Sequence, residues 1–192
     1  MPRLILASTS PYRKAQLEQL KIPFAAMASN VDEDAFKSQD LSPRELALRL
    51  AIEKAQAVAK NHLEAVVIGG DQLVSFGGQI LGKPQTEENA IEQLARLAEN
   101  SHDLITAVAV CHQGACQTHI DETRLWMRPL GREALERYVR ADRPLDCAGA
   151  YKIESLGIAL FERIETQDHT AITGLPLLAI VRLLNAAGIQ VP

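Results

Sequence analysis

The chain begins with a short apolar run that stops abruptly at three small hydroxyl residues and a proline. Residues 4–7 (LILA) have the length and composition of a buried β-strand. Ser10 and Pro11 then mark the start of a helix, because serine is a preferred N-cap and proline fits the first helical position. The first fourteen residues therefore predict a strand, a tight polar loop and a helix N-terminus.

The first turn of this predicted helix carries two cations, Arg13 and Lys14. Cations at this end oppose the helix macrodipole, so a bound anion would offset an arrangement that is otherwise unfavourable. Backbone N–H groups, the hydroxyls of Ser8 and Ser10 and the Arg13 guanidinium would face one spot that suits a phosphate. The alternative is a capped helix with solvated cations, which is the more common meaning of an isolated Ser-Pro pair.

Composition limits the class of protein. The chain has 192 residues, of which 47% are hydrophobic and 23% are charged, as in ordinary globular domains. A formal net charge of -4 argues against general nucleic-acid binding, which needs a basic surface. No apolar run reaches membrane-spanning length, so we expect a cytoplasmic protein without a membrane partner.

Strand and helix patterns alternate irregularly along the rest of the chain. Helices are expected over 42–60, 86–97 and 132–140 and from 174 onward, and strands over 65–74, 105–110, 118–127 and 157–164. This order predicts an α/β fold with a mixed sheet flanked by helices. No linker interrupts it, so residues 1–192 are expected to form a single domain.

The cysteines and two of the histidines gather around a predicted turn at Gln113-Gly114. Cys111, His112, Cys116 and His119 invite a metal site, but their spacing matches no common zinc pattern and strand side chains alternate between faces. With only one further cysteine in the chain, no disulfide framework is indicated. The remaining histidines are expected at the surface: His62, His102 and His169.

Two charged residues stand where charge is costly. Lys54 shares the apolar stripe of its predicted helix with Leu50 and Val58, so its ammonium either passes the core to solvent or reaches an anion in a cleft. Asp71 directly follows a buried strand and two glycines, at the strand end where open α/β sheets bind ligands. A simple turn aspartate is the alternative for Asp71.

Two further features carry weaker indications. Lys83, between Gly82 and Pro84, could present its ammonium to a phosphate. The acidic run 32–34, expected in a loop, is either a solvated surface or a ligand for Mg²⁺ or Mn²⁺ through residues such as Glu33. Together with Lys54 and Asp71, these residues are the equipment of metal-dependent chemistry on a polyphosphate.

The same segments, in the same order, resemble those of the Maf family of nucleoside triphosphate pyrophosphatases. The matching pieces cover nearly the whole chain: residues 8–13 (STSPYR), 31–33 (VDE), 53–55 (EKA), 70–72 (GDQ), 82–84 (GKP), 147–151 (CAGAY) and 174–176 (GLP). The resemblance implies an elongated mixed α/β body with two lobes around a central cleft, like that of the inosine triphosphate pyrophosphatases. It also implies hydrolysis of a nucleoside triphosphate to the monophosphate and pyrophosphate, and suggests a homodimer.

The resemblance implies roles for particular residues. Asp71 matches the proton acceptor, and Glu33 matches a carboxylate that we assign, together with Asp71, to a divalent metal. Five residues are expected around the triphosphate: Ser8, Ser10, Arg13, Lys54 and Lys83. Of these, Lys54 and Lys83 are counted among the catalytic residues.

Three positions distinguish the branches of the family: Tyr12, Gln72 and Glu154. The branch that acts on 7-methyl-GTP typically has Trp, Gln and Glu there, so this chain resembles it except at Tyr12. The chemistry agrees, because N7-methylation makes guanine cationic and a cation gains about 0.5–2 kcal/mol over an aromatic face. Glu154 can accept hydrogen bonds from guanine N1–H and the N2 amino group, a paired edge that pyrimidines lack. Action on dTTP, UTP or a broader set, and a nucleotide-binding role in septum control, are the alternatives.

Overall fold

The computed structural model describes residues 2–192, and the chain divides into two compact units. Unit 1 contains the N-terminal residues as far as Gln72, together with Thr106–Asp121 and Asp168–Pro192. Unit 2 contains Leu73–Ile105 and Glu122–Gln167. A single domain over residues 1–192 remains a prediction.

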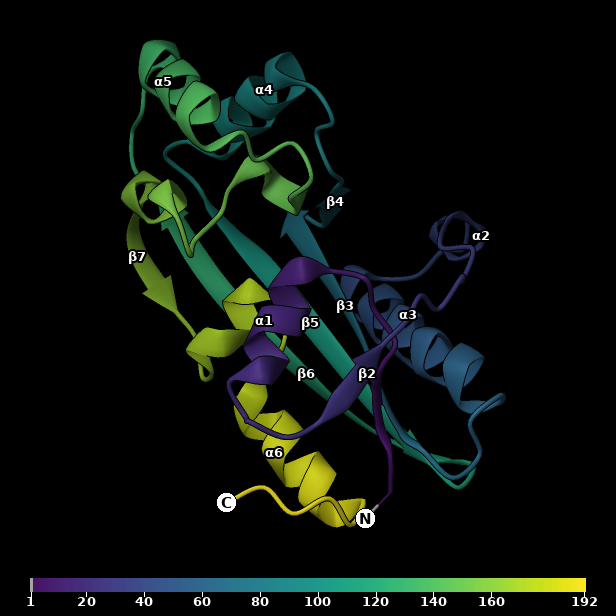
Figure 1. The fold of residues 1–192 in the computed structure, drawn as a ribbon. Coiled ribbons are helices and arrows are strands. Elements are labelled where there is room, and N and C mark those ends of the chain that lie inside the picture. Colours follow the sequence, from purple (N-terminus) through teal and green to yellow (C-terminus); the bar gives the residue numbers. More distant parts are fainter. Residues whose placement is uncertain (1) are drawn as a thin grey trace. The chain divides into compact units, whose positions relative to one another are not determined.

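The strands form one mixed sheet with the order β2-β1-β3-β5-β6-β7, and β4 pairs with β3 off this path. The bounds are β1 Leu4–Leu6, β2 Phe24–Ala26, β3 Val66–Phe76, β4 Gln79–Leu81, β5 Ser101–His112, β6 Ala115–Met127 and β7 Phe161–Glu165 (Figure 1). β1 runs parallel to both β2 and β3, whereas β7 pairs antiparallel with β6. The predicted α/β class with a mixed sheet and flanking helices is confirmed.

Unit 1 has a helical layer on each face of its part of the sheet. The helices are α1 Pro11–Glu18, α2 Asp34–Lys37, α3 Pro43–Ala59 and α6 Leu177–Ala186, with a 3₁₀ turn η3 at His169–Thr173. Leu4 and Ile68 belong to a buried cluster with Leu17 of α1 and Ile180 of α6. Because strand side chains alternate between faces, Ile5 points to the other face of the sheet. Helix α3 packs on that face, in contact with β3 at Gly69.

Helix α3 begins where the sequence predicts it. The Ser42 hydroxyl accepts a hydrogen bond from the Glu45 backbone N–H, and the Glu45 carboxylate accepts one from the Ser42 N–H. This capping box satisfies two N–H groups that a helix N-terminus otherwise leaves without partners. It fixes the helix start twelve residues, or about three turns, before Lys54.

Gly69 of β3 sets how closely α3 approaches the sheet. A Cβ atom at this position would lie 2.3 Å from the Ala51 carbonyl oxygen and 2.5 Å from the Ala55 nitrogen. Both are backbone atoms, so the helix would have to move to accommodate any side chain. The helix and the strand therefore pack in direct backbone contact, two residues before Asp71.

Unit 2 contains α4 Glu87–Leu97, α5 Arg132–Asp142, β4, β7 and the 3₁₀ turns η1 Ala148–Ala150 and η2 Leu156–Leu160. Helices α4 and α5 pack on one another (Figure 1). Arg132 of α5 forms salt bridges with Glu88 and Glu92 of α4 at 2.7 and 2.6 Å. These pairs are largely exposed, so apolar packing, including that of Leu94 and Leu135, stabilises the two helices more than the charges do.

The structure corrects several details of the sequence-based expectations. The strand predicted at 157–164 is wrong in its first half, because residues 156–160 form η2 and the strand begins only at Phe161. The acidic run is not wholly a loop, since Asp34 opens α2. Two short strands, β2 and β4, were not expected. Among residues 2–192, no helix combines the length and apolar character needed to cross a bilayer.

Candidate active site

Lys54 joins two carboxylates in unit 1. Its Nζ lies 2.6 Å from Asp71 Oδ1 and 2.7 Å from Glu33 Oε1. The Lys54 and Asp71 side chains are only 10% and 8% exposed, whereas that of Glu33 is 43% exposed. The ammonium on the apolar stripe of α3 therefore reaches anions, and the anions are two of the carboxylates that the sequence singled out. Its passage to solvent, the alternative from the sequence, does not occur.

Burial shapes the acidity of Asp71. It raises the pKa of this carboxyl above the ordinary value, and the positive charges of Lys54 and Arg13 only partly oppose it. Glu33 acts in the same direction as burial, because a second negative charge disfavours ionisation. A carboxylate with a raised pKa is a better proton acceptor than an ordinary aspartate.

The same centre influences Arg13. Burial lowers the pKa of its guanidinium, while Asp71 and Glu33 favour its charged form. The Arg13 Nε donates to the Gly174 carbonyl oxygen at 3.1 Å. Within residues 2–192 its two Nη atoms have no hydrogen-bond partner, so their N–H groups can serve a ligand.

The predicted phosphate loop has local hydrogen bonds of its own. Ser10 is the N-cap of α1 and accepts from the Arg13 backbone N–H at 3.4 Å. Ser8 accepts from the Ser10 backbone N–H at 3.1 Å. Both hydroxyls keep their O–H donors, because each of these bonds uses only an oxygen lone pair. The serines can thus stabilise the loop and donate to an anion at the same time.

The residues expected to hold a metal fit a substrate-bridged cation better than a cage made by the protein. The second carboxylate oxygen of Asp71, Oδ2, is buried and has no hydrogen-bond partner among residues 2–192. No cluster of three or more His, Cys, Asp or Glu side chains in the same range could hold a metal. Mg²⁺ is commonly held by one or two carboxylates plus substrate phosphates, so Asp71 and Glu33 suit it.

The two specificity positions of unit 1 have different surroundings. Tyr12, in the first turn of α1, is partly exposed. Gln72 is anchored: its Nε2 donates to Thr106 Oγ1 at 2.9 Å and to the carbonyl oxygens of Ala171 and Ile172 at 2.9 and 3.1 Å. The Gln72 amide nitrogen is therefore committed to backbone of the segment around η3.

Lys83 lies in unit 2, exposed, two residues after the end of β4. Side chains of α4 hold the backbone on either side of it, because Gln93 donates to the Gly82 carbonyl and Asn89 to the Pro84 carbonyl, each at 3.0 Å. The backbone on either side of this exposed ammonium is consequently held in place.

Glu154 is also exposed and belongs to unit 2, in the turn before η2. The turn is braced on both sides: Tyr138 Oη accepts from the Lys152 backbone N–H at 3.0 Å, and Ser155 Oγ donates to Asp142 Oδ1 at 2.5 Å. A side chain on such a fixed turn is well placed for recognition.

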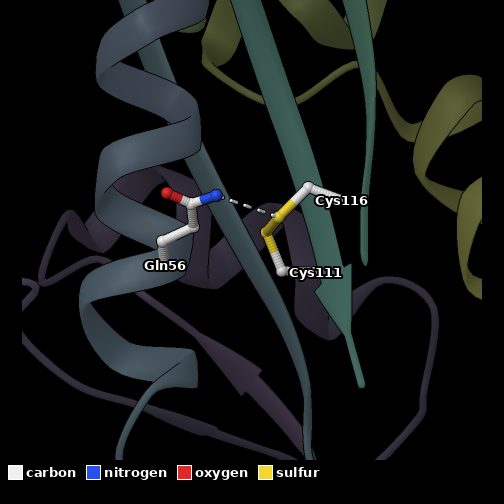
Figure 2. The surroundings of a disulfide bond; sticks show 3 residues. All are labelled: Gln56, Cys111 and Cys116. Atoms are coloured by element: carbon white, nitrogen blue, oxygen red, sulfur yellow. Dashed lines mark hydrogen bonds between the residues drawn. A yellow bond between two sulfur atoms is a disulfide. The ribbon is translucent and has the colours of Figure 1, made fainter. Parts of the chain in front are cut away.

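The hairpin cysteines form a disulfide, which corrects the expectation of none. Figure 2 shows Cys111 bonded to Cys116, with Gln56 of α3 donating from Nε2 to Cys116 Sγ at 3.8 Å. The two cysteines are equidistant from the Gln113-Gly114 turn, so they lie opposite one another and share a face. The equal spacing of the two cysteines from the turn was therefore a signal for the disulfide in the sequence. The bond uses both sulfur atoms, so they cannot serve as thiolate ligands of a metal.

His102 is buried rather than at the surface, which is a second correction. It is 2% exposed, and its Nε2 lies 3.0 Å from the Tyr151 hydroxyl oxygen. Its ring also contacts that of Phe161, at 5.8 Å between centroids. Burial lowers the pKa of His102 to about 4, so the imidazole is neutral at pH 7.

The fold and the buried Lys54 centre define an α/β protein with a polar site on a mixed sheet. Residues 3–187 match the family model described as Maf-like protein, and the chain belongs to the Maf family. A 7-methyl-GTP pyrophosphatase of Bdellovibrio bacteriovorus is 48% identical over 187 residues, covering 97% of this chain and 98% of the relative. A 7-methyl-GTP pyrophosphatase of Xanthomonas axonopodis is 45% identical over 192 residues, covering 100% of both. Among solved structures, a HAM1 protein from Coxiella burnetii gives a TM-score of 0.43 at 16% identity over 68% of this chain and 75% of the other.

Proposed function

We propose that this chain hydrolyses 7-methyl-GTP to 7-methyl-GMP and pyrophosphate, removing a modified nucleotide from the pool. The observation that carries the proposal is full-length identity of 45–48% to two relatives named 7-methyl-GTP pyrophosphatase. Gln72 and Glu154, the residues typical of that branch, support it. Tyr12 replaces the usual tryptophan but keeps an aromatic face for a cationic base. A cytoplasmic location and a homodimer stay predictions.

Asp71 is the proton acceptor in this proposal. Water attacks the α-phosphorus, Asp71 takes its proton, and the bond between the α-phosphorus and the oxygen bridging to the β-phosphorus breaks. The raised pKa of Asp71 favours this step, since its carboxylate holds a proton more readily than a solvent-exposed aspartate does. Lys54 holds Asp71 Oδ1 at 2.6 Å and thereby orients the carboxylate.

Positive groups neutralise the triphosphate. In unit 1, Arg13 offers its Nη donors, and Ser8 and Ser10 offer their hydroxyl donors. Lys83, in unit 2, is the further ammonium that the family resemblance assigns to the triphosphate. Glu33 and Asp71 would hold a divalent cation, with Asp71 Oδ2 as a buried oxygen still lacking a partner among residues 2–192. When bound, Mg²⁺ or Mn²⁺ supplies charge neutralisation and polarisation of the phosphoryl oxygens.

A nucleotide panel tests the proposal. Pyrophosphate release is measured with 7-methyl-GTP, GTP, dTTP and UTP at matched concentrations, with and without Mg²⁺. We expect the highest kcat/KM for 7-methyl-GTP, and turnover only with the metal. Equal rates for all four nucleotides would refute the substrate assignment, and faster hydrolysis of dTTP and UTP would place the chain in the other branch.

A further inference from the structure

The segment Asp168–Leu175 packs against α1 and is held mainly by side chains that lie far away in the sequence. Gln16 of α1 donates from Nε2 to the Thr170 carbonyl oxygen at 2.6 Å and to that of Leu175 at 3.4 Å. Arg13, one turn earlier on the same helix, donates to Gly174. Gln72 holds the segment from β3 through its contacts with η3. Three side chains thus fix one short stretch of irregular backbone.

The segment is also rigid by itself. Asp168 Oδ1 accepts from the Thr170 N–H at 2.9 Å, and Asp168 Oδ2 accepts from the Leu178 N–H at 2.9 Å. Thr170 Oγ1 accepts from the Leu177 N–H at 2.8 Å. These bonds tie η3 to the first turn of α6, so the Gly174 carbonyl between them has a defined direction.

Gly174 lies directly against the Arg13 side chain. Its φ is +117°, and a Cβ atom there would lie 3.3 Å from Arg13 Cγ and 3.4 Å from Arg13 Nε. The absence of a side chain therefore lets the guanidinium lie against the segment. Because a guanidinium is planar, a hydrogen bond that fixes Nε also fixes the directions of both Nη groups.

Gln16, in the last turn of α1, is only 5% exposed, which is unusual for a polar side chain. Its Oε1 is buried without a hydrogen-bond partner among residues 2–192, which is unfavourable. A leucine or methionine would avoid this and fill a similar space. The residue is consistent with a role that needs an amide N–H rather than with core packing alone.

We propose that Gln16 is a positioning residue for Arg13. By clamping the Asp168–Leu175 segment to α1, it holds the Gly174 carbonyl where Arg13 Nε can donate to it, and this aims the two Nη groups at the triphosphate. The inference rests on the proposed triphosphate site but not on the identity of the base. It assigns to the segment the task of orienting a phosphate-binding cation.

A double-mutant cycle tests this coupling. Gln16→Leu is expected to raise KM about tenfold with kcat changed less than threefold, since part of one charge-assisted bond to phosphate is lost. Arg13→Met is expected to raise KM further, and the double variant to be no worse than Arg13→Met alone. Additive effects on KM, or a Gln16→Leu variant with lowered stability and unchanged KM, would overturn the proposal.

A second pair of variants reaches the same contact from the other side. Gly174→Ala pushes on Arg13 and should raise KM about tenfold, because the added methyl group meets Cγ and Nε. Gly188→Ala is the matched control: its φ is +83°, but nothing lies within 4 Å of the new Cβ. It should lower stability with KM unchanged. An equal rise in KM for both glycine variants would show strain rather than positioning.

Calorimetric binding of inorganic tripolyphosphate separates this proposal from the substrate assignment. The ligand has no base, and the titration is done without added divalent metal so that no hydrolysis is expected. A chain that fails to prefer 7-methyl-GTP therefore still reports on Arg13. Gln16→Leu and Gly174→Ala should weaken tripolyphosphate binding about tenfold, and Gly188→Ala should not. Unchanged binding in both test variants would refute the role of Gln16 whatever the nucleotide panel shows.

Discussion

His102 makes the stability of unit 2 depend on pH. In the folded chain burial lowers its pKa to about 4, whereas an unfolded histidine has a pKa of about 6.5. The buried neutral imidazole therefore contributes its full stability above the pKa of the unfolded state. This contribution is lost as pH falls toward the pKa of the folded state. Linkage gives a loss of about 1.4 kcal/mol per pH unit in this window, or about 2 kcal/mol between pH 7 and pH 5.

Urea unfolding followed by tryptophan fluorescence measures this effect. Trp126 is the only tryptophan in the sequence and lies on β6 in unit 2, the unit that contains His102. His102→Gln keeps a polar side chain but does not titrate. We expect the free energy of unfolding to fall about 2 kcal/mol more in the original chain than in His102→Gln when pH drops from 7 to 5. Parallel falls in the two proteins would refute the argument that the buried imidazole stays neutral.

Three further predictions concern the site and the hairpin. Asp71→Asn should lower kcat about 10²- to 10⁴-fold while 7-methyl-GTP still binds, because the amide cannot take the proton from water. Burial raises the pKa of Asp71, so the acid limb of kcat/KM in the original chain should lie at a higher pH than an exposed aspartate would give. Near-normal turnover in Asp71→Asn would remove Asp71 from the mechanism. Glu154→Gln should reduce the preference for 7-methyl-GTP over dTTP about tenfold or more with phosphate chemistry retained, as measured by paired kcat/KM values; unchanged selectivity would contradict base recognition by this residue. Reduction of the Cys111–Cys116 bond, which closes a loop with a sequence separation of 5, should lower the free energy of unfolding by about 2 kcal/mol, whereas a variant with alanine at both positions should not respond to the reductant.

The sequence predicted the site best where a residue contradicts its local pattern. Lys54 interrupts an apolar stripe, and the physical cost of burying an ammonium made an anionic partner the only alternative to exposure. The structure supplies that partner as Asp71, a residue found for an independent reason, its position at a strand end. The inference about Lys54 needed helix periodicity and the cost of desolvation, and that about Asp71 needed its position after a buried strand.

The segment around η3 could not be predicted in this way. Its carbonyl groups are satisfied by Gln16, which is 154 residues distant from Thr170 in sequence, and by Gln72, which is 99 residues distant from Ala171. Such pairings depend on tertiary packing and leave no periodic trace. The family resemblance marked Gln72 as a specificity position, but the bonds from its amide nitrogen to the backbone could not be foreseen from the sequence.

His102 was misjudged because the predicted strand began too late. The sequence assigned strand only from Ile105, but β5 starts at Ser101, and residues 102 and 104 are both buried. An extended strand of alternating faces would have placed His102 inward, beside the aromatic ring of Tyr151.

The distance between Lys54 and Asp71 depends on the absence of a side chain at Gly69. A flexible side chain could move away from an added Cβ, but the atom that this Cβ would meet at 2.3 Å is the Ala51 oxygen, part of the α3 backbone. A methyl group at residue 69 would therefore push α3 away from β3. Because Lys54 lies on α3 and Asp71 on β3, it would also separate these two charged groups. Position 69 has no chemistry of its own, yet a substitution there should impair helix packing and activity together.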